Sequence, residues 1–339
     1  MKLVLKLFII QFLLGLVVGC SDDLVNSDTP SVEQLANHID AQLENWEPLY
    51  PATDLYSAIN NENAPFILSV RREVHYNSAH IIGAENVGWR NVTDQSALDA
   101  AGVPTNARVV AYSYTGHTGQ IAATVLKIMG YDAVNLKFGM MSWWSDSDNG
   151  GNEGGVEPFN YDYNPPNTGV NGIETTANEL PDSGTYELPE LELGNSDDVN
   201  KMARVAANKW IGHETPIIPA ATLYNNLRDG NTNNDPMILS VRSPDHYAAG
   251  HITGAYNIPW RDVADLDNLT KLDPSEEYVV YCYTGHTGQI ATTVLKMLGY
   301  NVTNLKFGMM GWSSNDSYMG GVGVFRASDV VNDSTVVAP

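Results

Sequence analysis

The stretch VVYCYTGHTG, residues 279–288, places a cysteine between an apolar run and a glycine-containing loop. The apolar run is typical of a buried strand, and the apolar residues at 290, 294, 295 and 298 keep the three-to-four spacing of a helix that stops at Gly299. A strand that turns tightly into a helix is the unit of a parallel sheet covered by helices on both faces. The stretch therefore predicts an α/β fold.

The same pattern occurs twice. Residues 112–143 match residues 281–312 at 24 of 32 positions, and residues 67–71 match residues 238–242 in full. We therefore expect two tandem α/β domains, each of ordinary size, with a parallel β-sheet flanked by helices on both faces. The predicted segments are a signal peptide (1–19), a tether (20–30), a first domain (31–159), a linker (160–195), a second domain (196–326) and a C-terminal tail (327–339).

Cys282 stands where a parallel sheet usually places its chemistry, at the carboxyl end of a strand. Several backbone N–H groups of such a loop can converge on the sulfur, and the dipole of the following helix adds partial positive charge. Both effects favour the thiolate, which is the nucleophilic form of cysteine. The alternative is a small buried hydrophobic residue, but a strand-to-helix turn with two glycines is a poor place for core packing.

Further motifs follow a recognisable order. They are Val241-Arg242, the stretch YAAGHITGA at 247–255, Asn257-Ile258-Pro259, the cysteine loop, Leu298-Gly299-Tyr300, and Gly308 with Trp312. This order resembles the rhodanese (thiosulfate sulfurtransferase) superfamily in its tandem two-domain form. The resemblance implies that Cys282 accepts a sulfane sulfur from a donor such as thiosulfate or mercaptopyruvate. It also implies transfer through a persulfide to cyanide, a thiol or a partner protein, without a cofactor.

The first copy differs from the second at the decisive position, because Ser113 stands where the second copy has Cys282. Serine is a far weaker nucleophile and cannot hold a persulfide. Two-domain rhodaneses commonly pair an inactive first copy with an active second one, so the resemblance implies a structural role for the first domain. Hydrolysis by Ser113 is a remote alternative, since no positioned base is readable nearby.

The predicted substrate-binding loop comprises Tyr283, Thr284, Gly285, His286, Thr287 and Gly288. It lacks the two cations that thiosulfate-preferring family members carry after the cysteine, which implies weaker capture of a dianion. His286 could supply positive charge when protonated. Arg242 and Arg261 are possible substrate contacts, with a structural ion pair as an equal alternative for each.

Other functions remain open. A sulfur carrier with slow turnover, or an interaction module that has lost its chemistry, would have the same fold. The sequence argues against phosphatase activity, because Gly288 and Gln289 occupy the region where rhodanese-like phosphatases close their loop on an arginine. The pairs His75/His80 and His246/His251 suggest scaffold rather than metal ligands. The acidic residues within 146–153 could hold calcium, but a solvated loop is the default.

The N-terminus predicts the location. Lys2 and Lys6 precede an apolar run that ends in Val17-Val18-Gly19-Cys20, which resembles a bacterial lipobox with Cys20 as the lipidated residue. The expected location is the cell envelope, with the protein anchored by lipid, and Ser21 favours the outer membrane. The formal net charge is -22, from 18 basic and 40 acidic residues, which argues against nucleic acid as a partner.

Overall fold

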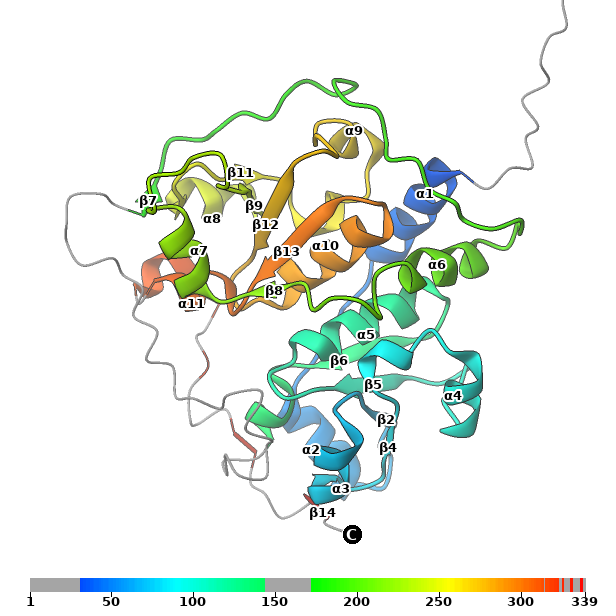
Figure 1. Cartoon of the computed structure of the whole chain (residues 1–339). Helices are drawn as coiled ribbons and strands as arrows, with labels where there is room; N and C mark the ends of the chain where they lie inside the picture. Colours follow the sequence, from blue (N-terminus) through cyan, green and yellow to red (C-terminus); the bar gives the residue numbers. More distant parts are fainter. Residues whose placement is uncertain are drawn as a thin grey trace, which may run out of the picture.

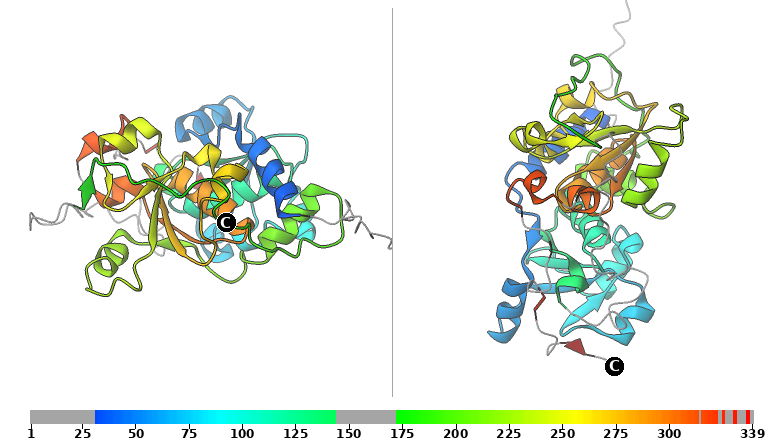
Figure 2. Two further views of the ribbon diagram at one scale, coloured as in Figure 1. Left: turned by 90° about the horizontal axis from the view of Figure 1, so that it is seen from above. Right: turned by 90° about the vertical axis from the view of Figure 1, so that its left-hand side faces the viewer.

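The computed structural model describes residues 31–143, 172–313, 315–322, 325, 330–331 and 336–337. The predicted signal peptide, the tether, the lipidation residue Cys20 and the acidic loop 146–153 lie outside the described residues. Two α/β units follow one another, with the second above the first in Figure 1 and in the right-hand view of Figure 2. The predicted fold class is confirmed.

The first copy forms a five-stranded parallel sheet in the order β1-β6-β5-β2-β4. Its helices are α1 (Val32–Leu43), α2 (Ala52–Asn60), α3 (Glu73–Ser78), α4 (Gln95–Ala100) and α5 (His117–Ile128), with short 3-10 helices η1 (Trp89–Asn91) and η2 (Gly139–Ser142). Its strands are β1 (Leu49–Tyr50), β2 (Phe66–Ser69), β3 (His80–Ile81), β4 (Ala84–Asn86), β5 (Val109–Tyr112) and β6 (Ala133–Leu136).

The second copy repeats this sheet in the order β8-β13-β12-β9-β11, again with parallel pairing. Its helices are α6 (Val199–Asn208), α7 (Ala220–Asn226), α8 (Pro244–Ala249), α9 (Leu266–Leu269), α10 (His286–Met297) and α11 (Gly308–Trp312), with η4 (Trp260–Asp262) and η5 (Asp316–Met319). Its strands are β8 (Ile217–Ile218), β9 (Met237–Ser240), β10 (His251–Ile252), β11 (Tyr256–Asn257), β12 (Glu277–Tyr281) and β13 (Asn301–Leu305).

Helices α5 and α10 lie between the two sheets and pack against each other (Figure 1). Both are almost entirely buried, which explains why the repeated sequence is most alike there: each helix must fit its own sheet and its counterpart. One cluster of buried apolar side chains runs through both copies. Since α5 follows the serine loop and α10 follows the cysteine loop, this packing brings the two loops together at the seam between the copies.

Each copy is followed in the chain by a short strand that pairs with a strand of the other copy. Strand β7 (Ile173–Glu174), which follows the first copy, pairs antiparallel with β10 of the second. Strand β14 (Val336–Val337), which follows the second copy, pairs antiparallel with β3 of the first. The interval predicted as a linker is, from Gly172 onward, an extended segment that runs over the second copy, where Leu193 is buried (Figure 1).

Candidate active site

Cys282 directly follows β12 and precedes α10, as the sequence predicts. Its side chain is 1% exposed. The backbone N–H of Gly285 donates a hydrogen bond of 3.1 Å to the cysteine Sγ, the one such donor among the described residues. Gly285 has φ of +88°, a conformation that side chains with a Cβ disfavour, and this turn aims its N–H back at the sulfur. A backbone donor beside the sulfur stabilises a negative charge there.

Helix α11 holds the loop from behind. The N–H groups of Met309 and Met310 donate hydrogen bonds of 2.8 Å to the carbonyl oxygens of Cys282 and Tyr283. A Cβ on Gly308 would lie 2.5 Å from the Cys282 carbonyl oxygen, so only glycine permits this close approach. The carbonyls of the loop therefore point to α11, which leaves the opposite, N–H side of the loop for the sulfur.

The remaining loop residues each have a defined partner. The Tyr283 hydroxyl accepts from the Ser243 N–H at 3.2 Å and lies 2.5 Å from His246 Nδ1, while Asn304 Nδ2 donates to the Gly285 carbonyl at 3.0 Å. Gly288 lies so close to the Asn304 side chain that a Cβ would lie 2.5 Å from its Oδ1. Thr284 is buried, and Thr287 is half-buried in the first turn of α10. Asn304 is a loop-supporting residue that sequence reasoning missed; the repeat of Asn-Leu-Lys-Phe-Gly in both copies is the signal that points to it.

The serine loop of the first copy makes the same backbone hydrogen bond as the cysteine loop, but the environment of its central side chain, Ser113, is different. Met140 N–H donates to the Ser113 carbonyl at 2.8 Å, as Met309 does to Cys282. The Ser113 Oγ, however, is buried and has no hydrogen-bond partner among the described residues. The loop geometry is thus retained in a copy whose side chain receives no hydrogen bond from it.

His286 and His117 stack across the seam with ring centroids 5.7 Å apart. Each ring accepts a backbone hydrogen bond from the opposite copy: Phe138 N–H donates to His286 Nε2, and Phe307 N–H donates to His117 Nε2, both at 3.1 Å. Since Nε2 is the acceptor, the proton of each neutral ring is on Nδ1, which lies 3.0 Å from Thr284 Oγ1 in His286 and 2.9 Å from Thr115 Oγ1 in His117.

The prediction that His286 supplies a positive charge is wrong. Its ring is fully buried, and burial, followed by the neighbouring His117 and Lys137, holds its pKa well below the usual value. Burial and Lys306 lower the pKa of His117 to about 3. The sequence shows a histidine in a loop but not the second loop packed against it, and that packing keeps both rings neutral.

This arrangement predicts an acid-sensitive seam. The pKa of each histidine is lower in the folded than in the unfolded state, so its contribution to stability is complete above the unfolded value of about 6.5. It is lost as the pH falls toward the folded value, which for His117 is about 3. For His117 we expect the free energy of unfolding to fall by up to about 1.4 kcal/mol per pH unit across this window, and His286, whose pKa is also lowered, should add to the loss in the same direction.

Urea denaturation at pH 5, 6 and 7 would measure this slope. In the His117→Gln variant the free energy of unfolding should depend less steeply on pH, because the contribution of His117 is removed. The His38→Gln variant, at a half-buried histidine on α1, should keep the wild-type slope. Equal slopes in the wild type and His117→Gln would contradict the expectation.

Arg242 and Arg261 are both engaged in contacts within the protein. The Arg242 guanidinium is fully buried, donates to the carbonyls of Tyr318 and Gly250, and lies against the rings of Tyr281 and Tyr283. Arg242 therefore supports the cysteine loop by packing against Tyr283.

Arg261 crosses the seam and donates to the carbonyl of Leu43, the last residue of α1, at 2.6 Å and to that of Trp46, just beyond the helix, at 3.0 Å. Its counterpart in the first copy, Arg90, likewise crosses the seam to the Glu214 carbonyl and Thr215 Oγ1. Because the serine copy makes the same type of contact, the geometry favours the structural alternative for Arg261 over a substrate contact.

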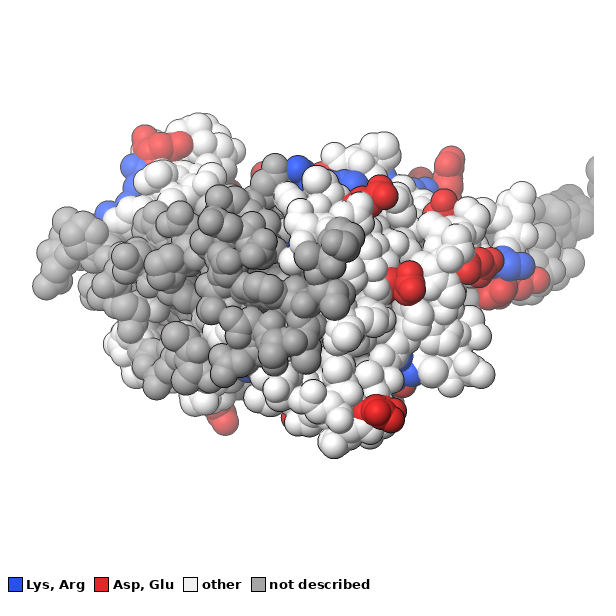
Figure 3. All heavy atoms as spheres, turned by 90° about the horizontal axis from the view of Figure 1, so that it is seen from below, with Lys and Arg blue, Asp and Glu red and all other residues white. Residues whose placement is uncertain are grey.

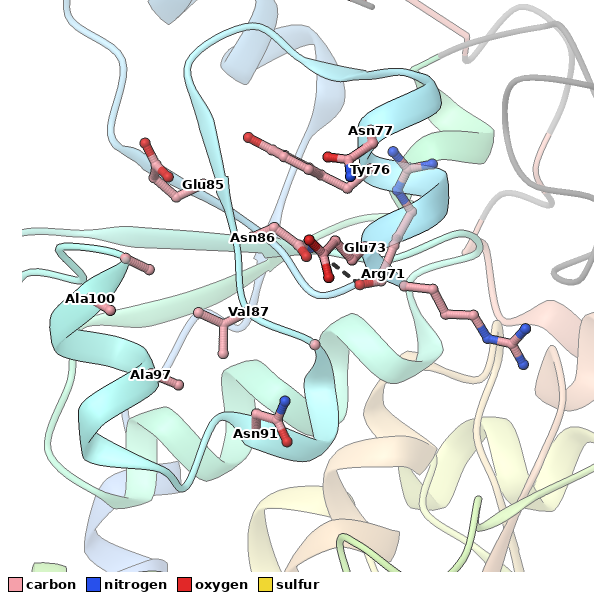
Figure 4. A pocket seen from close by; sticks show the side chains of 13 residues that line it. Arg71, Glu73, Tyr76, Asn77, Glu85, Asn86, Val87, Asn91, Ala97 and Ala100 are labelled. Atoms are coloured by element: carbon pink, nitrogen blue, oxygen red, sulfur yellow. Dashed lines mark hydrogen bonds between the residues drawn. The ribbon is translucent and has the colours of Figure 1, made fainter. Parts of the chain in front are cut away.

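Other polar groups lie apart from the cysteine. A hollow in the first copy is lined from α3, β4 and α4, including Tyr76, Asn86 and Ala97, and contains no residue of the cysteine loop (Figure 4). His75 and His246 each contact a tyrosine hydroxyl, and within the described ranges no three His, Cys, Asp or Glu residues are grouped to hold a metal ion. Acidic side chains are dispersed over the described part of the face in Figure 3. Among the described residues, no helix combines the length and hydropathy needed to cross a membrane.

The model of the rhodanese-like domain family matches residues 51–146 and again residues 219–315, together more than half of the chain. The chain therefore belongs to the rhodanese-like domain family, in a tandem form. Each match contains one of the two loops described above.

Several known relatives carry sulfurtransferase names. The thiosulfate sulfurtransferase GlpE of Pseudomonas entomophila is 37% identical over 79 residues, which cover 23% of this chain and 71% of that protein. The thiosulfate:glutathione sulfurtransferase of Saccharomyces cerevisiae is 28% identical over 132 residues, 34% of this chain and 95% of that protein. A solved rhodanese-related protein from Thermoplasma volcanium is 28% identical and covers 29% of this chain and 90% of its own, with a TM-score of 0.26.

Proposed function

We propose that this protein is a sulfurtransferase that carries a sulfane sulfur on Cys282. The Cys282 thiolate attacks the outer sulfur of a donor such as thiosulfate, the sulfur–sulfur bond of the donor breaks, and its electron pair leaves with sulfite. The new bond is a persulfide, whose outer sulfur carries the negative charge. An acceptor such as cyanide or a thiol then attacks that outer sulfur and returns Cys282 to the thiolate.

One observation carries the proposal: the Gly285 N–H points at the Cys282 sulfur, in a loop whose carbonyls are held away by α11. This places a hydrogen-bond donor where a thiolate or a persulfide needs one. The serine copy serves as the comparison, because no residue that the structure describes forms a hydrogen bond with its Ser113 Oγ. The names of the relatives support the same class of reaction.

The test is the mass of the intact protein. Full-length protein with Cys20→Ser, in which Cys282 is the single cysteine, should gain one sulfur atom on incubation with thiosulfate and lose it again on addition of cyanide. Uptake without discharge would instead indicate a sulfur carrier. No gain in mass with either thiosulfate or mercaptopyruvate would contradict the proposal.

We propose that the protein works in the bacterial cell envelope, anchored through lipid on Cys20. The lipobox-like ending of the apolar run supports this location. Metabolic labelling with palmitate should mark the wild-type protein and leave Cys20→Ala unmarked. Unlabelled wild-type protein in the soluble fraction would contradict it.

A further inference from the structure

We propose that His117, in the copy that lacks the cysteine, is a positioning residue for the Cys282 loop. This inference rests on the proposed function in treating that loop as catalytic. It goes further in assigning to the serine copy a specific contribution to the reaction rather than a general packing role.

The contacts between His117 and the cysteine form a short series. His117 Nε2 accepts the N–H of Phe307 at 3.1 Å. Two residues on, the Met309 N–H donates to the Cys282 carbonyl at 2.8 Å. His117 also touches the loop directly, since a Cβ on Gly285, the residue that donates to Sγ, would collide with its Nε2. The ring therefore contacts both the donor residue of the loop and the start of the helix behind it.

The backbone at Phe307 requires such support. Phe307 has φ of +63°, a left-handed conformation that costs a residue with a Cβ about 1–2 kcal/mol. Its ring packs edge-on against His117 with centroids 4.9 Å apart. The hydrogen bond and this ring contact hold Phe307 in the conformation that starts α11, and α11 in turn fixes the carbonyls of the loop.

Because both residues are buried, loss of the hydrogen bond between His117 and Phe307 would be costly. His117 is 2% exposed and Phe307 is 5% exposed, so water cannot readily take the place of His117 Nε2 as the acceptor of this hydrogen bond. The low pKa of His117 keeps Nε2 free to accept at any pH above about 3. The contact also gives a physical reason for the identical TGHTG sequence in both copies despite the change at Ser113.

Hydrogen exchange measured by mass spectrometry tests the contact without requiring turnover. In His117→Asn the side-chain oxygen is too short to reach the Nε2 position, so exchange of the amides at 307–310 should rise about tenfold. His117→Gln reaches that position and should restore protection. The amides at 138–141 provide an internal control, since Phe138 is held by His286 and should change little. His38→Gln controls for the loss of a histidine elsewhere in the first copy.

Kinetics then link the contact to the reaction. We expect kcat for sulfur transfer to fall about tenfold in His117→Asn, with KM nearly unchanged and recovery in His117→Gln, because the loop rather than donor capture is disturbed. Wild-type-like exchange at 307–310 in His117→Asn would overturn the inference. So would an unprotected Phe307 amide in the wild type, a result that does not depend on any variant folding. Absence of sulfur transfer in the wild type would instead refute the proposed function, while the exchange data would still decide on the contact.

Discussion

Cys282→Ser should lower thiosulfate-to-cyanide sulfur transfer by at least about a thousandfold while leaving thermal unfolding almost unchanged. A serine hydroxyl cannot form a persulfide, so the variant lacks the group that carries the sulfur. The fold should tolerate the change, because Ser113 occupies the equivalent loop with the same backbone hydrogen bonds. Activity would be followed as thiocyanate formation and stability as the midpoint of thermal unfolding.

Ser113→Ala is the matched control for this prediction. It removes the corresponding side-chain atom from the first copy, where Oγ has no hydrogen-bond partner within the described part of the chain, and should preserve both activity and stability. Sulfur transfer that survives in Cys282→Ser would show that the chemistry lies elsewhere. Loss of activity in Ser113→Ala would assign the serine a part in the reaction.

Gly285→Ala should destabilise the protein by about 3 kcal/mol or more and abolish most of its activity. Part of the cost is the left-handed backbone at φ of +88°. The larger part is steric: the new Cβ would collide with His117 and lie 2.9 Å from the Phe307 nitrogen. The contact with His117 crosses the seam, so the two loops would have to separate, whereas the contact with Phe307 lies within the second copy, at the start of α11.

Gly254→Ala separates the two costs. Gly254 has φ of +81° but has nothing within 4 Å of the position that a Cβ would take. Its substitution should therefore cost only the backbone part, about 1–2 kcal/mol. Equal losses of stability in the two variants, measured by thermal unfolding, would contradict this prediction. They would show that the contact between Gly285 and His117 can open at little cost in stability.

Local sequence patterns were sufficient for the architecture. The strand, the loop and the helix around Cys282 are all encoded by neighbours in the chain, and the structure confirms them as β12, the turn at Gly285 and α10. The duplicated sequence likewise predicts two equivalent sheets, which the identical strand orders confirm. These features depend on hydrophobic periodicity and on glycine conformation, both of which are local properties.

The environment of the side chains could not be predicted in the same way. From the sequence, His286 is a candidate to supply positive charge when protonated, but packing against the first copy buries it completely and keeps it neutral. Arg261 lies in sequence close to the family motifs, yet its guanidinium group binds carbonyls at the end of α1, more than two hundred residues earlier. Both outcomes are set by how the two copies face each other, and no local pattern carries that information.

The crossed pairing of β7 with β10 and of β14 with β3 determines how the chain can be divided. A break within residues 175–195 would give two fragments, each carrying the short strand that completes the other. Alone, each fragment would expose an unpaired strand edge, which is a template for association with other molecules. Mixed together, the fragments can complement one another without a covalent link, so this interval is a natural place at which to split the protein into a reporter whose sulfur-transfer activity depends on reassembly.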